Sequence, residues 1–265
     1  MINGATDVNR PDAGRWPATL WIVRHGQSAG NVARDAADAA GDLRIAIEGR
    51  DVDVPLSALG REQAEALGRW FARGDAHGLP EVMLSSPYLR AIETAQAFRA
   101  AGGCDADEAI CLDERLREKE FGILDGLTHA GIAAQFPDQS HFRSVLGKFY
   151  HRPPGGESWA DVILRLRSLM DTVSLHYAGM RVMIVAHQVV VLCLRYIIET
   201  LDEARILEID RAGDVANCGV TEYRFDLAHG RHGGLALVRY NETAPVEQGA
   251  APVTSAPDPI VAARG

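Results

Sequence analysis

The chain has 265 residues, of which 47 % are hydrophobic and 24 % are charged, enough apolar material for one large domain or two small ones. Its formal net charge of −9 at pH 7 argues against non-specific binding to nucleic acid or to a membrane surface. No apolar run approaches the roughly 18 residues of a membrane-spanning helix, and residues 1–17 lack the features of a signal peptide. We therefore expect a cytoplasmic protein.

The cysteines have no spacing typical of a metal site. Two of them, Cys111 and Cys193, lie in apolar runs. We expect reduced core thiols at all four positions, which are Cys104, Cys111, Cys193 and Cys218.

The two ends of the chain differ from its middle. Residues 1–16 carry Asn, Asp, Gly and Pro, and residues 242–265 are rich in Ala, Pro, Val and Thr without a period. Both compositions predict segments that are either flexible or draped over the surface. The sequence thus predicts one domain over residues 17–241, flanked by a flexible N-terminus and a flexible C-terminal tail.

Short apolar runs predict strands. In chain order they cover residues 19–24, 81–85, 181–186, 219–225 and 235–240. The third run (RVMIVA) is apolar throughout its interior, as is typical of a strand covered on both faces. A Gly- and His-rich turn separates the last two, which could form a hairpin or a sheet edge.

Helical periodicity predicts helices between these strands. Residues 59–73 place Ala64, Leu67 and Phe71 on one stripe. Ser86 followed by Pro87 predicts a helix with Pro at its first position, running to about residue 100.

Ser158 and Asp161 resemble a capping box. The helix that they open sets one apolar face of Trp159, Val162, Leu166, Met170 and Val173. A final helix should follow His187. The alternation of strands and helices predicts an α/β fold with a mostly parallel sheet and helices on both faces.

Three strands run into polar residues that a core would not favour. The first ends in Arg24-His25-Gly26, the second in Ser85-Ser86-Pro87 with Arg90 following, and the third in His187-Gln188. Ligands of open α/β sheets bind outside the carboxyl ends of the strands, so His25, Arg90 and His187 are expected to share one crevice.

Two arginines and two histidines would make such a crevice strongly cationic. Guanidinium groups bind phosphate oxygens in a bidentate manner, which makes a small phosphorylated ligand the natural prediction. An imidazole can attack phosphorus as a nucleophile, while neighbouring cations stabilise the equatorial oxygens. The leaving oxygen would then need a proton from a nearby carboxylic acid.

The residues at these positions resemble the signature of the histidine phosphatase superfamily. The first block is Arg24-His25-Gly26-Gln27-Ser28 with Asn31. Further blocks agree in order: Ser85-Ser86-Pro87-Tyr88-Leu89-Arg90, Leu116-Arg117-Glu118, Gly155-Gly156-Glu157-Ser158 and Val185-Ala186-His187. The resemblance covers residues 21–241 and implies a three-layer αβα sandwich with a lid-like helical insertion over residues 122–154.

The resemblance also implies roles for individual residues. His25 would be the nucleophile that becomes phosphohistidine, and Glu118 the general acid and base, with Glu114 and Glu120 as neighbouring candidates. Arg24, Arg90 and His187 would grip the phosphoryl group, and Asn31 and Gln188 would add polar contacts. The resemblance implies no metal and no organic cofactor.

Within the superfamily, the motifs are closest to the branch of the fructose-2,6-bisphosphatases. His187-Gln188 and Lys148 resemble that branch, and Arg143 could match an arginine that holds a remote phosphate. Three features depart from that branch: His129 replaces a tyrosine, Leu192 replaces an arginine, and residues 32–48 form a longer insert.

The sequence therefore predicts a metal-independent phosphatase that hydrolyses a small phosphate monoester, such as a sugar phosphate or a related metabolite. Two alternatives stay open: a cofactor-dependent phosphoglycerate mutase, and a noncatalytic phosphate-binding regulatory domain. Nucleic acid and membranes are not expected partners. The oligomeric state is open, a homodimer included.

Overall fold

One six-stranded sheet runs through the part of the chain that the structure, a computed structural model, describes: residues 14–74, 78–104, 109–230 and 232–255. Its strand order is β3-β2-β4-β1-β5-β6. The strands are β1 (Thr19–Arg24), β2 (Val82–Ser85), β3 (Ile110–Leu112), β4 (Arg181–Ala186), β5 (Val220–Asp226) and β6 (Gly234–Glu242). The first four in this order are parallel, whereas β5 and β6 form an antiparallel hairpin that pairs with β1. The expected mostly parallel sheet is confirmed.

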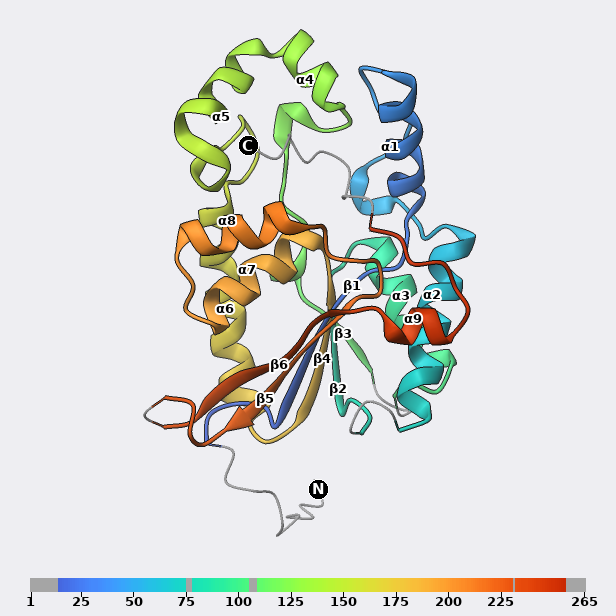
Figure 1. Cartoon of the computed structure of the whole chain (residues 1–265), viewed down its shortest axis with the longest axis vertical. Helices are drawn as coiled ribbons and strands as arrows, with labels where there is room; N and C mark the ends of the chain where they lie inside the picture. The colour runs from blue at the N-terminus through green and yellow to red at the C-terminus, as the bar shows by residue number, and fades with distance from the viewer. Residues whose placement is uncertain (1–13, 75–77, 105–108, 231, 256–265) are drawn as a thin grey trace, which may run out of the picture.

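Helices cover both faces of the sheet, as the α/β prediction requires (Figure 1). One face carries α2 (Ala58–Ala72), α3 (Leu89–Ala100) and α9 (Ala244–Gln248), and the other carries α6 (Trp159–His176) and α7 (Gln188–Ile198), with α8 (Glu203–Ala212) beside α7. Over the end of the sheet toward which β1 runs stand α1 (Ala29–Ala40), α4 (His129–Gln135) and α5 (Pro137–Tyr150). None of the described helices is both long and apolar enough to cross a membrane.

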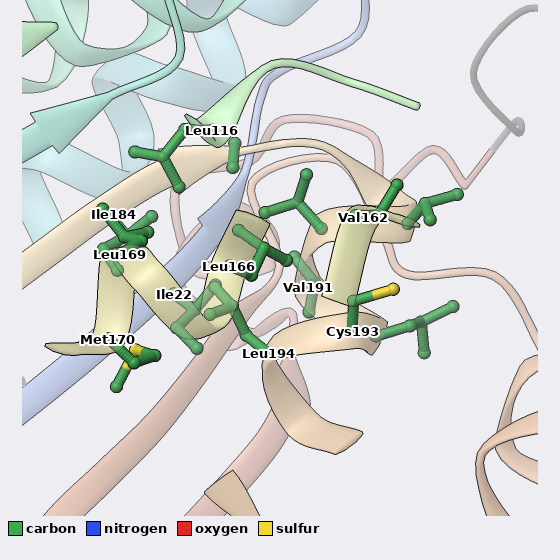
Figure 2. Packing of buried hydrophobic residues seen from close by; sticks show 14 of the residues in the cluster. Ile22, Leu116, Val162, Leu166, Leu169, Met170, Ile184, Val191, Cys193 and Leu194 are labelled. Carbon is green, nitrogen blue, oxygen red and sulfur yellow. The ribbon is translucent and has the colours of Figure 1, made fainter. Parts of the chain in front are cut away.

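Alternate residues of β1 build two separate cores, because successive side chains of a strand point to opposite faces. Leu20 and Ile22 join the cluster formed with α6 and α7, whereas Trp21 and Val23 join the cluster formed with α2 and α3. Figure 2 shows Ile22 and Ile184 of the sheet packed among the leucines of α6 and α7. Each such fully buried side chain stabilises the fold by about 1.5–3 kcal/mol.

The capping box at the start of α6 is confirmed: the Ser158 hydroxyl accepts from the Asp161 amide, and the Asp161 carboxylate accepts from the Ser158 amide. The expected start of α3 is wrong, because the helix begins at Leu89 and Pro87 precedes it. The Ser86 hydroxyl accepts from the Tyr88 amide (3.3 Å) and contacts His187, so residues 86–88 form a turn instead.

The helix after His187 is not the last, since α8 and α9 follow it. The C-terminal tail was expected from residue 242 to be flexible or draped over the surface, and its described part packs on the domain. Val246 of α9 is fully buried against α2, and Ala251 is also buried. The remaining tail residues, 256–265, and the N-terminal residues 1–13 lie outside the described part, so the domain boundaries stay a prediction.

Cys104, Cys193 and Cys218 are buried free thiols, as expected, but Cys111 is exposed. Its apolar run is the short edge strand β3, which is covered less than a central strand.

The insert over residues 32–48 forms most of α1 and a segment that packs against the lid. The Ile45 amide donates to the Gly126 carbonyl (2.9 Å), and the Thr128 amide donates to the Leu43 carbonyl (3.2 Å). Ala37 and Ile45 share a small core with lid residues Leu124, Leu127 and Ile132. The insert and the lid therefore form one packed unit.

Gly60 lets the start of α2 approach the turn that follows β1. A Cβ atom at this position would lie 2.0 Å from the Gln27 carbonyl oxygen, which belongs to the backbone and has little freedom to move. We expect Gly60→Ala to lower the free energy of unfolding by about 1–3 kcal/mol in urea denaturation. The control Gly213→Ala places its Cβ in open space and should change stability by less than about 0.5 kcal/mol. Equal effects of the two substitutions would contradict this expectation.

Candidate active site

The carboxyl ends of β1, β4 and β2 lie side by side at one edge of the sheet, because β4 pairs in parallel with both neighbours. The His25 amide donates to the Ala186 carbonyl (2.9 Å), and the Ser86 amide donates to the Val185 carbonyl (3.0 Å). These bonds bring the residues after the three strands to the same level. His25 and His187 meet there, with their ring centroids 5.2 Å apart.

His25 is fully buried, and its ring is fixed by the turn that contains it. Its Nδ1 atom lies 2.7 Å from the Gly26 carbonyl oxygen, which can only accept a hydrogen bond. Nδ1 must therefore carry the proton, and a neutral imidazole then has its lone pair on Nε2. The Thr94 hydroxyl holds the same turn by accepting from the Gly26 amide (3.0 Å).

His187 is held by the turn of residues 86–88. Its Nε2 lies 2.8 Å from the Ser86 hydroxyl oxygen, and the Tyr88 ring packs edge-on at 5.1 Å between centroids. The Tyr88 hydroxyl donates to the Glu120 carboxylate (2.9 Å). Burial, together with the Glu120 carboxylate, raises the pKa of Tyr88, so the hydroxyl stays protonated.

Both arginines of the motif are fully buried. Arg24 donates to the Val215 carbonyl (2.6 Å). Arg90 donates to both carboxylate oxygens of Asp51 (3.1 Å each), and its guanidinium carbon lies 5.0 Å from the centre of the Tyr88 ring. Asp51, 39 positions away from Arg90, orients the guanidinium plane. No pattern in the sequence singled it out.

Glu118 is almost fully buried, and one of its carboxylate oxygens accepts from the Lys119 amide (2.7 Å). The segment around it is anchored by Glu157, which accepts from Arg117 (2.7 Å), from Arg165 (3.0 Å) and from the Glu120 amide (3.1 Å). Burial tends to raise the pKa of Glu157, but the bonds from Arg165 and its neighbours outweigh burial and lower it. Glu157 thus stays ionised and fixes the segment that carries Glu118.

The two predicted polar contacts, Asn31 and Gln188, are buried and have structural partners. Asn31 completes the capping box at the start of α1, where its Oδ1 accepts from the Ser28 amide (2.9 Å). The side-chain nitrogen of Gln188 donates to the Asp214 carboxylate (2.8 Å). Leu192, which replaces an arginine of the family pattern, is buried in the core between α6, α7 and the sheet.

Arg143 and Lys148 line a cavity of about 390 Å³ between the lid and α8, and the paired histidines are not among its lining residues. Lys119 also lines this cavity, and it follows Glu118 directly in the sequence. Lys148 forms an ion pair with Asp210 (2.5 Å). The lining of the cavity includes four basic side chains and two histidines: Lys119, Arg143, Lys148, Arg211, His129 and His151.

Burial and neighbouring cations together lower the pKa values of two cavity residues, Lys119 and His151. Burial and the nearby Arg143 lower the pKa of Lys119 to about 8. Burial, Arg143 and Lys119 likewise lower the pKa of His151. An anion in this cavity would relieve the repulsion among these groups. Lys119 was not among the predicted site residues, although its place next to Glu118 could have suggested it.

Across residues 14–74, 78–104, 109–230 and 232–255, no three His, Cys, Asp or Glu side chains are grouped as metal ligands would be.

Two buried imidazoles and two buried arginines lie at the carboxyl edge of an α/β sheet. Such a set of groups is typical of proteins that bind a phosphate group. The chain belongs to the histidine phosphatase superfamily (branch 1), whose sequence profile matches residues 20–243. This confirms the family that the sequence motifs resembled.

The chain is 30 % identical over 222 residues to a 6-phosphofructo-2-kinase/fructose-2,6-bisphosphatase of Caenorhabditis elegans, covering 81 % of this chain and 43 % of the relative. It is 31 % identical over 203 residues to a 2,3-bisphosphoglycerate-dependent phosphoglycerate mutase of Sinorhizobium fredii, covering 74 % and 87 %. A mycobacterial glucosyl-3-phosphoglycerate phosphatase solved with inorganic phosphate is similar in structure (TM-score 0.63, 26 % identity, 86 % and 99 % covered). The chain spans less than half the length of the first curated relatives that it matches.

Proposed function

We propose that this protein is a phosphatase that hydrolyses a small phosphate monoester through a phosphohistidine on His25. The observation that carries the proposal is the pair of buried imidazoles, with His25 held by Gly26 in the tautomer that puts its lone pair on Nε2. An uncharged nitrogen lone pair is the form of imidazole that can attack phosphorus.

In the first step, Nε2 of His25 forms a bond to phosphorus while the bond between phosphorus and the ester oxygen breaks. Glu118 gives its proton to the departing oxygen. Arg24, Arg90 and His187 stabilise the negative charge on the three equatorial oxygens, and they cost little reorganisation because the protein already holds them in place.

In the second step, the Glu118 carboxylate takes a proton from water as the water oxygen bonds to phosphorus. The bond between nitrogen and phosphorus breaks, which releases inorganic phosphate and restores neutral His25. No step in this sequence is assigned to a metal or an organic cofactor, and Asn31 and Gln188 are proposed to add polar contacts to the phosphoryl group.

The leaving group of the substrate is proposed to extend toward the lid cavity, with a second anionic group near Arg143, Lys148 and Lys119. Two of the relatives are named for substrates that carry such a group, a bisphosphate and a phosphoglycerate ester. We propose a phosphorylated sugar or related metabolite of the cytoplasm as the substrate.

The test is phosphate release from sugar phosphates, sugar bisphosphates, phosphoglycerates and p-nitrophenyl phosphate, with EDTA present. Release from at least one ester would support the proposal. Failure to hydrolyse any of them would count against it and favour a noncatalytic phosphate-binding domain.

A mutase is the second candidate, because the Sinorhizobium fredii relative is named as one. It would interconvert 3- and 2-phosphoglycerate when primed with bisphosphoglycerate, whereas a phosphatase would release phosphate instead. A coupled assay on both phosphoglycerates separates the two.

Lys119 gives the proposed second-anion site a pH dependence. With a pKa of about 8, the amine is charged at pH 7, and only about a tenth of it is charged at pH 9. For a bisphosphate substrate we expect kcat/KM to fall by up to about ten-fold from pH 7 to pH 9.

The matched variant Lys119→Arg keeps its charge over this range and should flatten the profile. p-Nitrophenyl phosphate, which lacks a second anion, serves as the control substrate. Identical pH profiles for wild type and Lys119→Arg would remove Lys119 from the proposed site.

A further inference from the structure

The C-terminal segment after α9 reaches the back of the turn that carries His25. At its start, α9 itself is anchored by Val246, which is fully buried against α2. Further along, the Asn217 amide donates to the Thr254 carbonyl (2.8 Å), which ties the segment to the loop before β5. The segment therefore lies close to the backbone of the turn that contains His25.

Two buried side-chain amides form hydrogen bonds with the backbone of that turn. The carbonyl oxygen of Gln63 accepts from the Gln27 amide (2.9 Å). The Asn217 side-chain nitrogen donates to the His25 carbonyl (3.0 Å). Both side chains are fully buried, so neither can exchange these bonds for bonds to bulk water.

The Thr254 hydroxyl joins the two amides. It accepts from the Gln63 side-chain nitrogen (2.9 Å) and donates its single proton to the Asn217 side-chain oxygen (2.9 Å). Because the oxygen of Asn217 is turned toward Thr254, its nitrogen is turned toward the His25 carbonyl. The hydroxyl thus sets the orientation of the group that holds the nucleophile.

The second proton of the Gln63 side-chain nitrogen goes to the Pro252 carbonyl (2.8 Å). The bonds form a chain from the Gln27 amide through Gln63, Thr254 and Asn217 to the His25 carbonyl. Its two ends are the residues on either side of Gly26, whose carbonyl fixes the proton on Nδ1 of His25.

We propose that Thr254 is a positioning residue for the nucleophile, acting through Gln63 and Asn217 on the backbone on either side of His25. The proposal rests on the proposed function for the role of His25. Thr254 contacts neither the substrate nor the imidazole. Its effect is on the placement of the reacting nitrogen, on which the rate of an oriented reaction depends steeply.

The experiment compares Thr254→Val, which keeps the shape and removes the hydroxyl, with Thr254→Ser, which restores it. Thr254→Val should lower kcat for p-nitrophenyl phosphate by about ten-fold while KM changes by less than about two-fold. Thr254→Ser should recover most of the loss. Val253→Ala, at an exposed neighbouring position, should match wild type and controls for general disturbance of the segment.

Two further measurements keep the proposal testable. Asn217→Asp removes the donor to the His25 carbonyl, so its effect on kcat should be strongly non-additive with that of Thr254→Val. Nitrogen-15 NMR of the histidine side chains reports the Nδ1–H form of His25 without any turnover, and Thr254→Val should weaken or shift that signal.

Wild-type kcat and an unchanged NMR signal in Thr254→Val would overturn the proposal. So would equal losses in Thr254→Val and Thr254→Ser, or additive effects with Asn217→Asp. If the wild-type protein hydrolyses no ester, the proposed function fails, and the NMR comparison alone decides the role of Thr254.

Discussion

His25→Ala is expected to lower phosphate release by at least about 10³-fold, because the reaction loses the atom that accepts the phosphoryl group. The residual rate would be that of water attacking a phosphate held by Arg24, Arg90 and His187. The substituted protein should still bind phosphate, since those three residues are supported by Val215, Asp51 and Ser86.

The measurement combines steady-state turnover with trapping of the intermediate. Wild-type protein quenched in alkali during turnover of a labelled ester should retain labelled phosphate on histidine, and His25→Ala should retain none. The control His176→Ala changes an exposed histidine at the end of α6 and should behave as wild type. Normal turnover in a folded His25→Ala protein would refute the mechanism.

Glu118→Gln is expected to separate substrates by their leaving groups. An alkyl phosphate such as a sugar phosphate needs a proton on its departing oxygen, so its turnover should fall by about 10²–10⁴-fold. p-Nitrophenolate leaves without protonation, so the first step should survive with this substrate. The second step still lacks its base, and we expect a burst of one p-nitrophenolate per site followed by slow turnover.

The neighbouring carboxylates supply matched controls. Glu114 is exposed, and Glu114→Gln should leave both substrates unaffected. Glu120 accepts the Tyr88 hydroxyl, and Glu120→Gln should cause a smaller loss that is the same for both substrates. A dependence on the leaving group that appears in Glu120→Gln and not in Glu118→Gln would move the acid to Glu120.

The sequence predicted those parts of the site that follow from local pattern. His25 and His187 end apolar runs, and parallel strands bring such ends together, so their meeting could be expected from the order of the strands alone. Arg90 could be expected for the same reason. Its partner Asp51 could not, because the two are 39 positions apart and nothing in the intervening sequence encodes their approach.

Tertiary contacts also explain where the pattern misled. Pro87 favours a helix start, but the Ser86 hydroxyl is used by His187, which lies 101 positions later. The composition of the tail gave no periodic signal for α9, in which Val246 is buried against α2. The strand β3 was missed because three residues at an exposed edge carry little periodic signal. The pairing of Lys148 with Asp210 likewise joins residues 62 positions apart.

The shared core of the insert and the lid determines what can be exchanged between members of this family. A Cβ atom at Gly131 of the lid would lie 1.9 Å from the Leu43 carbonyl oxygen of the insert, so the two backbones fit only with glycine at that position. A lid transplanted from a relative without such an insert would leave Ala37 and Ile45 uncovered. Residues 32–48 and 122–154 thus form one module for engineering, and a change of substrate made by grafting would have to move both together.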